Sequence, residues 1–125
     1  ARLPLLGLIA AGEPIEALEN PEMVDVPVSL LHPDHYVLQV KGNSMIDEQI
    51  HDKDYIVARK TNTARSGQIV VALINGEATL KYYVQGPGGV ELHPRNPDFP
   101  IIKVDPKDDF HINGVLLYSF RNYLN

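Results

Sequence analysis

Short apolar runs recur along this sequence, most of them five to eight residues long and rich in Val, Ile, Leu and Tyr. Nine glycines and ten prolines separate these runs at short intervals. Such spacing is typical of strands joined by turns, whereas amphipathic helices need longer stretches with a helical period. The pattern therefore predicts a mostly β fold, compact and strand-rich, without internal repeats or low-complexity segments.

Seven segments carry the strand pattern most clearly. They are residues 36–40, 55–59, 68–74, 77–84, 90–93, 101–104 and 113–121. Asn75 and Gly76 lie between two of them and supply the positive-φ positions of a type I′ turn, which predicts a β-hairpin. Residues 44–50 are expected to form one helical turn. The last segment is apolar on both faces, so it lies either at the centre of the sheet or in an interface.

Residues 1–35 are predicted to form an extended, irregular arm. The prolines in this part interrupt any helix and cannot donate a hydrogen bond within a central strand. They are Pro4, Pro14, Pro21, Pro27 and Pro33. Residues 13–25 are acidic, so we expect this part of the arm to be solvated.

The charge balance argues against one class of function. Among 125 residues, 11 are basic and 16 are acidic, so the formal net charge is −5. Such a chain lacks the positive field that binding to phosphate backbones needs. Hydrophobic residues make up 44% of the sequence and are spread along it, which argues against disorder. We therefore expect one folded domain that does not itself bind DNA.

The sequence contains no cysteine, which excludes disulfides, thiolate nucleophiles and cysteine-bound metals. No run approaches the roughly 18 apolar residues that would cross a bilayer, so no membrane span is expected. Residues 3–11 are similar to the apolar core of a signal peptide, but the single basic Arg2 and the early Pro4 argue against that interpretation. The chain begins without Met, which suggests a fragment or a processed form.

Five histidines invite a metal interpretation. His32 and His35 flank Asp34 in a predicted loop, and the other histidines lie far away in the sequence. A lone His-x-x-His in a loop is a weak signal, because a metal site needs several convergent ligands. We therefore expect solvated loop histidines, with no metal and no cofactor.

Ser44 follows Gly42 at the end of a predicted strand, where backbone N–H groups at the turn can face a carbonyl oxygen. The segment lacks the second glycine of a nucleophile elbow, so a Ser-His-Asp triad is not indicated. A neutral lysine amine can act as the base instead when burial lowers its pKa. Lys81 is the candidate, and it shares a strand face with Thr79 and Tyr83. Composition alone favours a turn serine and an exposed lysine, and spacing does not show that they meet.

An ordered set of motifs resembles the C-terminal domain of the LexA repressors, from about residue 3 to residue 121. The motifs are VKGNSM at 40–45, DYIVA at 54–58, GQIVVA at 67–72, TLK at 79–81 and LHPRNP at 92–97. Upstream, GLIAAGEP at 7–14 is similar to the self-cleavage segment of that family. Gln49 and Lys53 differ from the family pattern, because they stand where glycines are common, and this puts the local turn geometry in question.

The resemblance implies a serine endopeptidase that acts on its own chain. Ser44 would be the nucleophile, Lys81 the general base, and Ala11–Gly12 the scissile bond. Small residues on both sides of this bond suit a tight cleft. Covering the site with the cleavage segment would desolvate Lys81 and favour its neutral form, so cleavage would depend on docking of the segment.

The resemblance also implies how the cleavage segment is held. The backbone N–H groups of Asn43 and Ser44 would form the oxyanion hole. Leu8, Ile9 and Ala10 would dock the segment in extended form, as peptides do when they add to a sheet.

The organisation of the protein follows from the same resemblance. Residues 1–35 would be the linker and cleavage-site segment, and residues 36–125 the Ser/Lys peptidase and dimerisation domain, with the strand over 115–120 as the homodimer interface. The chain would be part of a cytoplasmic SOS-response transcriptional repressor that cleaves itself after DNA damage, when a RecA–single-stranded DNA filament favours the docked segment. Operator DNA would be bound only through an N-terminal helix-turn-helix domain outside this sequence.

Several alternatives stay open. Phage repressor C-terminal domains and UmuD-like polymerase accessory proteins share the chemistry, although UmuD-like proteins are cleaved after Cys and this chain has Ala11. A non-catalytic dimerisation module could retain the same fold. Type I signal peptidases also use a serine and a lysine, but this sequence shows no membrane anchor.

Overall fold

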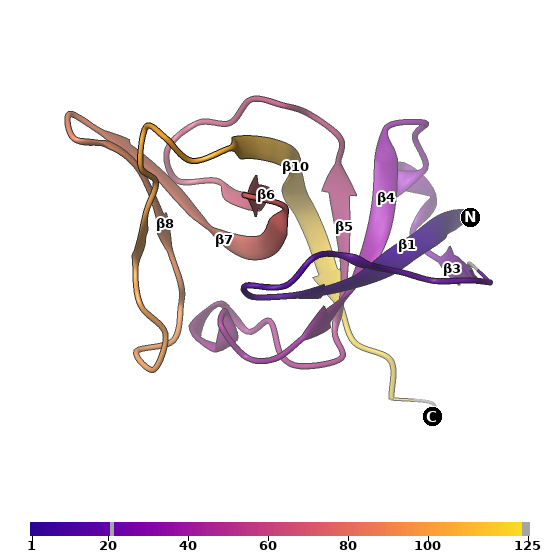
Figure 1. The fold of residues 1–125 in the computed structure, drawn as a ribbon. Coiled ribbons are helices and arrows are strands. Elements are labelled where there is room, and N and C mark those ends of the chain that lie inside the picture. Colours follow the sequence, from indigo (N-terminus) through magenta and orange to yellow (C-terminus); the bar gives the residue numbers. More distant parts are fainter. Residues whose placement is uncertain (21, 124–125) are drawn as a thin grey trace.

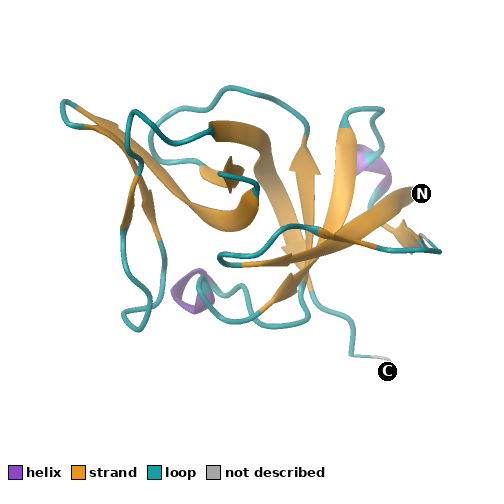
Figure 2. Ribbon diagram, viewed as in Figure 1, coloured by secondary structure: helices purple, strands orange, loops and turns teal. Residues whose placement is uncertain are grey.

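Strands make up nearly all of the regular structure (Figure 2). The computed structural model describes residues 1–20 and 22–123, so Pro21 and the last two residues of the predicted 36–125 domain lie outside the described residues. The strands are β1 (Arg2–Ala10), β2 (Glu16–Ala17), β3 (Met23–Asp25), β4 (His35–Lys41), β5 (Tyr55–Arg59), β6 (Ile69–Ile74), β7 (Glu77–Gly86), β8 (Gly89–His93), β9 (Ile102–Lys103) and β10 (Phe110–Phe120). Two short 3₁₀ turns, η1 (Val28–Leu30) and η2 (Ile46–Glu48), complete the elements of these residues. The predicted mostly β fold is confirmed.

The described strands join into a single sheet. Neighbouring strands pair in the order β2-β1-β4-β5-β10-β6-β7-β8-β9, and β3 pairs with β1. The pairing of β1 with β4 is parallel, and the other pairings are antiparallel. In Figure 1, β4, β5 and β10 stand side by side, with the long β7–β8 hairpin to their left. The order places β10 at the centre of the sheet, which is one of the two positions that its apolar pattern predicts.

The sheet curves so that the end of β1 returns to β7, although four strands lie between them in the order. Glu13 and Ala78 form an antiparallel bridge. The Ala78 N–H donates to the Glu13 carbonyl at 2.6 Å, and the Gly12 N–H donates to the Ala78 carbonyl at 3.2 Å. These two bonds fix the turn that follows β1 against the strand that carries Lys81.

The predicted hairpin and helical turn are both confirmed. Asn75 and Gly76 have φ angles of 52° and 83°, and β6 and β7 pair directly on either side of them. Positive φ at both central residues is what a type I′ turn requires. The expected helical turn within residues 44–50 is the 3₁₀ turn η2.

The prediction of an irregular arm over residues 1–35 is wrong in part. Arg2–Ala10 form the nine-residue strand β1, and the short strands β2 and β3 pair with it. Pro4 fits into this strand opposite Met23. The Leu5 N–H donates to the Glu22 carbonyl, and the Val26 N–H donates to the Ala1 carbonyl. Antiparallel ladders alternate bonded and non-bonded pairs. Pro4 and Met23 form a non-bonded pair, so the missing N–H of Pro4 removes no hydrogen bond to β3. Buried and less buried side chains alternate along β1, as in a strand with one face in the core. The segment therefore forms a strand although it contains a proline.

Two positions that carry glycine in the resembled family have the left-handed backbone here without glycine. Gln49 has φ 63° and Lys53 has φ 74°. The turn geometry therefore persists, at a steric cost that the Cβ atom imposes in this region. Replacement by glycine would remove this steric cost from the folded state. The gain in stability is larger than the loss that comes from the greater conformational entropy of glycine in the unfolded chain.

Replacing Lys53 with glycine is therefore expected to raise the free energy of unfolding by about 0.5–1 kcal/mol. Lys60 is a matched control, because it is also an exposed loop lysine but has an ordinary φ. Lys60→Gly is expected to lower the free energy of unfolding by about 0.5–1 kcal/mol, since only the unfolded state gains freedom. Urea denaturation of both variants measures the difference. Equal destabilisation by the two substitutions would contradict the argument.

Candidate active site

Lys81 lies in β7 and is almost completely buried, with 1% of its surface exposed. Its amino group donates hydrogen bonds to the Ser44 hydroxyl at 3.0 Å, the Thr79 hydroxyl at 2.5 Å and the Leu80 carbonyl at 3.2 Å. Among the described residues, none of these partners is a carboxylate. Burial therefore lowers the pKa of Lys81 to about 8 without a compensating negative charge.

This burial overturns the exposed position that composition alone favours for a strand lysine. Thr79, Lys81 and Tyr83 share a face of β7, as the alternation predicts, and all three are buried. β7 lies between β6 and β8, and the turn after β1 lies against it. In this position the lysine side chain is almost completely shielded from solvent, and its amine lies beside the Ser44 hydroxyl.

Ser44 lies in the loop between β4 and η2, and its side chain is half-buried. Gly42 begins this loop with φ 93°, a conformation that favours glycine. The Asp52 carboxylate accepts the Gly42 N–H at 2.8 Å, and the Asp52 N–H donates to the Asn43 side-chain oxygen at 2.9 Å. Met45 is 2% exposed and anchors the loop in the core. The loop is therefore fixed on both sides of the serine.

The loop that follows β8 holds the Ser44 loop from outside. The Arg95 N–H donates to the Ser44 carbonyl at 2.9 Å, and the Asn96 amide donates to the Asn43 carbonyl at 2.8 Å. The Arg95 guanidinium in turn pairs with Glu48 at 3.1 Å. Sequence reasoning assigned no role to Arg95 or Asn96. Both residues belong to the LHPRNP motif at 92–97, which indicated only the family resemblance.

The far end of the same loop is held by an ion pair. Arg121, directly after β10, donates to the two carboxylate oxygens of Asp54 at 2.6 and 2.9 Å. The His51 N–H donates to Asp54 at 2.8 Å. Burial raises the pKa of the Asp54 carboxyl, but the hydrogen bonds from Arg121 and His51 outweigh burial, so the pKa falls below its usual value. Asp54 therefore stays ionised and keeps the loop attached to the central strand.

Ala11 and Ser44 line one cavity of about 230 Å³. Its lining residues are Ala10, Ala11, Glu13, Lys41, Gly42, Asn43, Ser44 and Phe99. Gly12 lies just beyond, in a turn with φ 77°, and lines a neighbouring cavity with Ala78 and Thr79. Within residues 1–20 and 22–123, the backbone N–H groups of Asn43 and Ser44 donate to no protein acceptor. The cavity thus combines a hydroxyl, free N–H donors and a small-residue turn.

The three residues expected to dock the cleavage segment lie at the end of β1. Ile9 is 2% exposed and belongs to a core cluster with Met45 and Leu80. Leu8 and Ala10 are half-buried, and Ala10 also lines the cavity beside Ser44. The segment is therefore packed against the domain in this structure.

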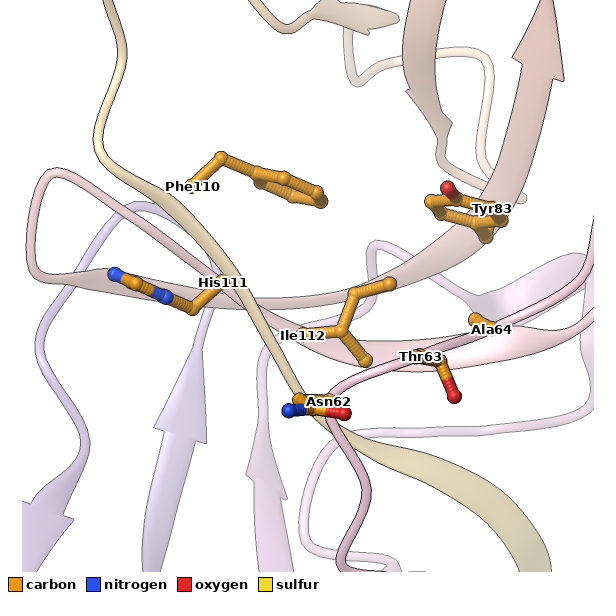
Figure 3. Close-up of a pocket in the computed structure, with 7 residues that line it drawn as sticks. All are labelled: Asn62, Thr63, Ala64, Tyr83, Phe110, His111 and Ile112. Atoms are coloured by element: carbon orange, nitrogen blue, oxygen red, sulfur yellow. The ribbon is translucent and has the colours of Figure 1, made fainter.

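Neither the serine nor the lysine lines a separate hollow of about 410 Å³. Figure 3 shows the side chains around this hollow. Its lining residues are Asn62, Thr63, Ala64, Tyr83, Phe110, His111 and Ile112. It contains no nucleophile paired with a base, and His111 instead pairs with Asp109 at 2.6 Å. This hollow is larger than the cavity beside Ser44, but only the cavity beside Ser44 has a hydroxyl that is hydrogen-bonded to a lysine amine.

A metal interpretation of the histidines depends on several ligands that converge within the described part of the chain. The His, Asp and Glu side chains of this part form no group of three or more that could hold a metal ion. His32 and His35 stack at 4.8 Å between ring centroids, as an isolated pair. No described helix is long and apolar enough to cross a membrane.

Known proteins are similar to this chain over nearly its whole length. The family model for Peptidase S24-like proteins matches residues 4–117, so the chain belongs to this family. The LexA repressor of Syntrophotalea carbinolica is 48% identical over 124 residues, which cover 98% of this chain and 61% of that protein. The LexA repressors of Erythrobacter litoralis and Pseudothermotoga lettingae are 47% and 48% identical, over 97% and 98% of the chain. The resemblance that the motifs indicated is confirmed.

The chain spans only part of the length of these relatives. It covers 52% of the Erythrobacter protein and 62% of the Pseudothermotoga protein. Membership of the Peptidase S24-like family holds for this domain itself.

Proposed function

We propose that this domain is the self-cleaving part of an SOS-response transcriptional repressor and that it cuts its own Ala11–Gly12 bond with Ser44 and Lys81. One observation carries the proposal: the buried Lys81 amine lies 3.0 Å from the Ser44 hydroxyl, at a cavity that Ala11 also lines. A nucleophile within hydrogen-bond reach of a base is the arrangement that acyl transfer requires.

The reaction begins with neutral Lys81, which accepts the proton of the Ser44 hydroxyl as Oγ attacks the Ala11 carbonyl carbon. The negative charge on the Ala11 oxygen is stabilised by the free N–H groups of Asn43 and Ser44. The C–N bond then breaks, and Lys81 passes its proton to the departing Gly12 amine. Water hydrolyses the resulting Ala11–Ser44 ester, with Lys81 again as the base, and regenerates the serine.

Burial prepares Lys81 for this role. With a pKa of about 8, about a tenth of the amine is already neutral at pH 7, far more than for an exposed lysine. The Thr79 hydroxyl and the Leu80 carbonyl accept hydrogen bonds from the same amine and hold it toward Ser44. The side chain therefore needs no rearrangement before it accepts a proton.

In the whole protein, the cut would separate this domain from an N-terminal DNA-binding domain. Repression would then fail, because a repressor depends on paired half-site contacts in a dimer. A RecA–single-stranded DNA filament would stimulate the reaction by binding the docked conformation more tightly than the undocked one. Such a protein works in the cytoplasm.

Intact mass spectrometry over time tests the proposal. At alkaline pH the chain is expected to convert to two products, residues 1–11 and residues 12–125. Addition of an activated RecA filament is expected to give the same products at neutral pH. A folded chain that stays uncut under both conditions would favour a non-catalytic dimerisation module, and a cut at another bond would refute the assignment of Ala11 and Gly12.

We also propose that β10 forms the homodimer interface. Leu117 and Tyr118 are 36% and 43% exposed at a bulge in this strand, although the strand itself is central to the sheet. Adjacent exposed apolar side chains on a rigid strand suit an interface between copies.

Replacing Tyr118 with glutamate is expected to weaken the dimer by about tenfold or more, because a charge would be buried against the partner copy. Light scattering after size exclusion measures the mass. Val28→Glu is the control, since Val28 is also exposed and apolar but lies in η1. A dimer that Tyr118→Glu leaves unchanged would remove this strand from the interface.

A further inference from the structure

β1 lies inside the sheet and not at its edge. On one side it pairs in parallel with β4, from Leu5 opposite Val37 to Ala10 opposite Lys41. On the other side it pairs with β3 through its first half and with β2 through its second half. Its backbone is therefore paired with β4 between residues 5 and 10, and with β3 or β2 at residues 2–4, 7 and 8.

The side chains of β1 also belong to the core. Leu3, Leu5 and Ile9 are 3%, 4% and 2% exposed. Leu3 and Leu5 pack in a cluster with Val37 and Val57, which come from β4 and β5. Removing β1 would leave these residues facing water and would leave β4 as an unpaired edge.

The proposed scissile bond lies after this strand, in an exposed turn. The cut therefore assigns all of β1 to the N-terminal product. The two hydrogen bonds that join Gly12 and Glu13 to Ala78 stay within the C-terminal product. Scission thus breaks one covalent bond and none of the pairings that hold β1 between β4 and its other neighbours.

We propose that β1 remains in the sheet after the bond is cut, so that the two products stay together non-covalently and separate only in a second, slower step, the extraction of β1. The position of the cut rests on the proposed function. Any chain that precedes β1 in a longer protein would stay attached with it. Loss of the intact chain and loss of the N-terminal part would then be two events with separate rates.

A nick made by another enzyme tests this without relying on self-cleavage. The chain carries Ser44→Ala, to silence the proposed reaction, and a recognition sequence for a site-specific protease between Ala11 and Gly12. After digestion, native mass spectrometry and size exclusion are expected to show both pieces in one complex, which separates in guanidinium. Immediate loss of the N-terminal peptide under native conditions would overturn the proposal. Failure of self-cleavage in the unmodified chain would leave this result untouched and would count only against the proposed function.

Two adjacent leucines provide a matched comparison. Leu5 is 4% exposed, whereas Leu6 points outward and is 47% exposed. In the nicked chain, Leu5→Ala is expected to speed release of the peptide by at least about tenfold, and Leu6→Ala by less than about threefold. Each variant is checked by circular dichroism before the nick, and Leu5→Val replaces Leu5→Ala if the uncut chain does not fold. Equal release rates for the Leu5 and Leu6 variants would show that strand extraction does not limit separation.

Discussion

Self-cleavage is expected to disappear when Ser44 is replaced by alanine, with a fall in rate of at least about 1000-fold. The substitution removes the only atom that the proposed mechanism uses to attack Ala11. The Lys81 amine also donates to the Thr79 hydroxyl, but this hydroxyl is a poor substitute for Ser44. Thr79 is 3% exposed and does not line the cavity that Ala11 and Ser44 line. The fold should persist, since Lys81 keeps its bonds to Thr79 and Leu80.

Intact mass over time at alkaline pH measures this effect, and circular dichroism confirms the fold. Ser66→Ala is the control, because Ser66 is also a loop serine whose hydroxyl is hydrogen-bonded, in this case to Gln85. That variant is expected to cleave at the original rate. If the Ser44→Ala chain were still cut between Ala11 and Gly12, the nucleophile would have to be another group.

The second large effect concerns Lys81. Because its pKa is about 8, the neutral fraction rises about tenfold between pH ~7 and pH ~9 and then levels off. The first-order rate of cleavage is expected to follow this curve, and Lys81→Met is expected to abolish it. A rate that keeps rising well above pH 9 would indicate a base that ionises like an exposed lysine.

Stability should depend on pH through the same side chain. Lys81 has its ordinary pKa of 10.5 in the unfolded chain and about 8 in the folded one. The unfolded state therefore binds more protons between these values, and the free energy of unfolding rises as the pH increases from 8 to 10.5, by about 3 kcal/mol. This contribution is complete above 10.5 and is lost as the pH falls through 8.

Urea denaturation at several pH values tests the stability prediction, in a Ser44→Ala background so that no chain is cut. Other groups also titrate in this range, so the informative quantity is the difference between chains with and without Lys81→Met. Near pH 7 the methionine variant is expected to be more stable by up to about 3 kcal/mol, because a buried charge is gone. A difference that stays constant with pH would contradict the lowered pKa.

Local patterns predicted most of the sheet. The strands β4 to β10 follow from apolar alternation and from turn residues, and Asn75-Gly76 specified its hairpin because those residues tolerate positive φ. Local patterns missed β1 because Pro4 suggested an irregular arm, although the resemblance led us to expect Leu8, Ile9 and Ala10 in extended form. Whether a proline falls on a bonded or a non-bonded pair depends on the register with the partner strand. The sequence around the proline does not reveal that register.

The candidate site was harder to predict from local sequence. Ser44 lies in the loop after β4 and Lys81 in the middle of β7, and only the curvature of the whole sheet brings their side chains within 3.0 Å. The burial of Lys81 has the same origin. The turn after β1 lies against β7 only because the sheet curves, and the two strands are far apart in the sequence. The resemblance to a known family supplied these residues, whereas the loop contacts from Asp52, Arg95 and Asn96 required coordinates.

The bridge between Glu13 and Ala78 has a kinetic consequence. It joins the proposed substrate segment to the strand of its own base, three residues before Lys81, so each molecule carries one bond to cut and cuts it once. Such a reaction has no substrate concentration and cannot be saturated. The half-time of the intact chain would not depend on the protein concentration. The fraction of chains cut would depend on how long the activating signal lasts and not on the number of copies of the protein.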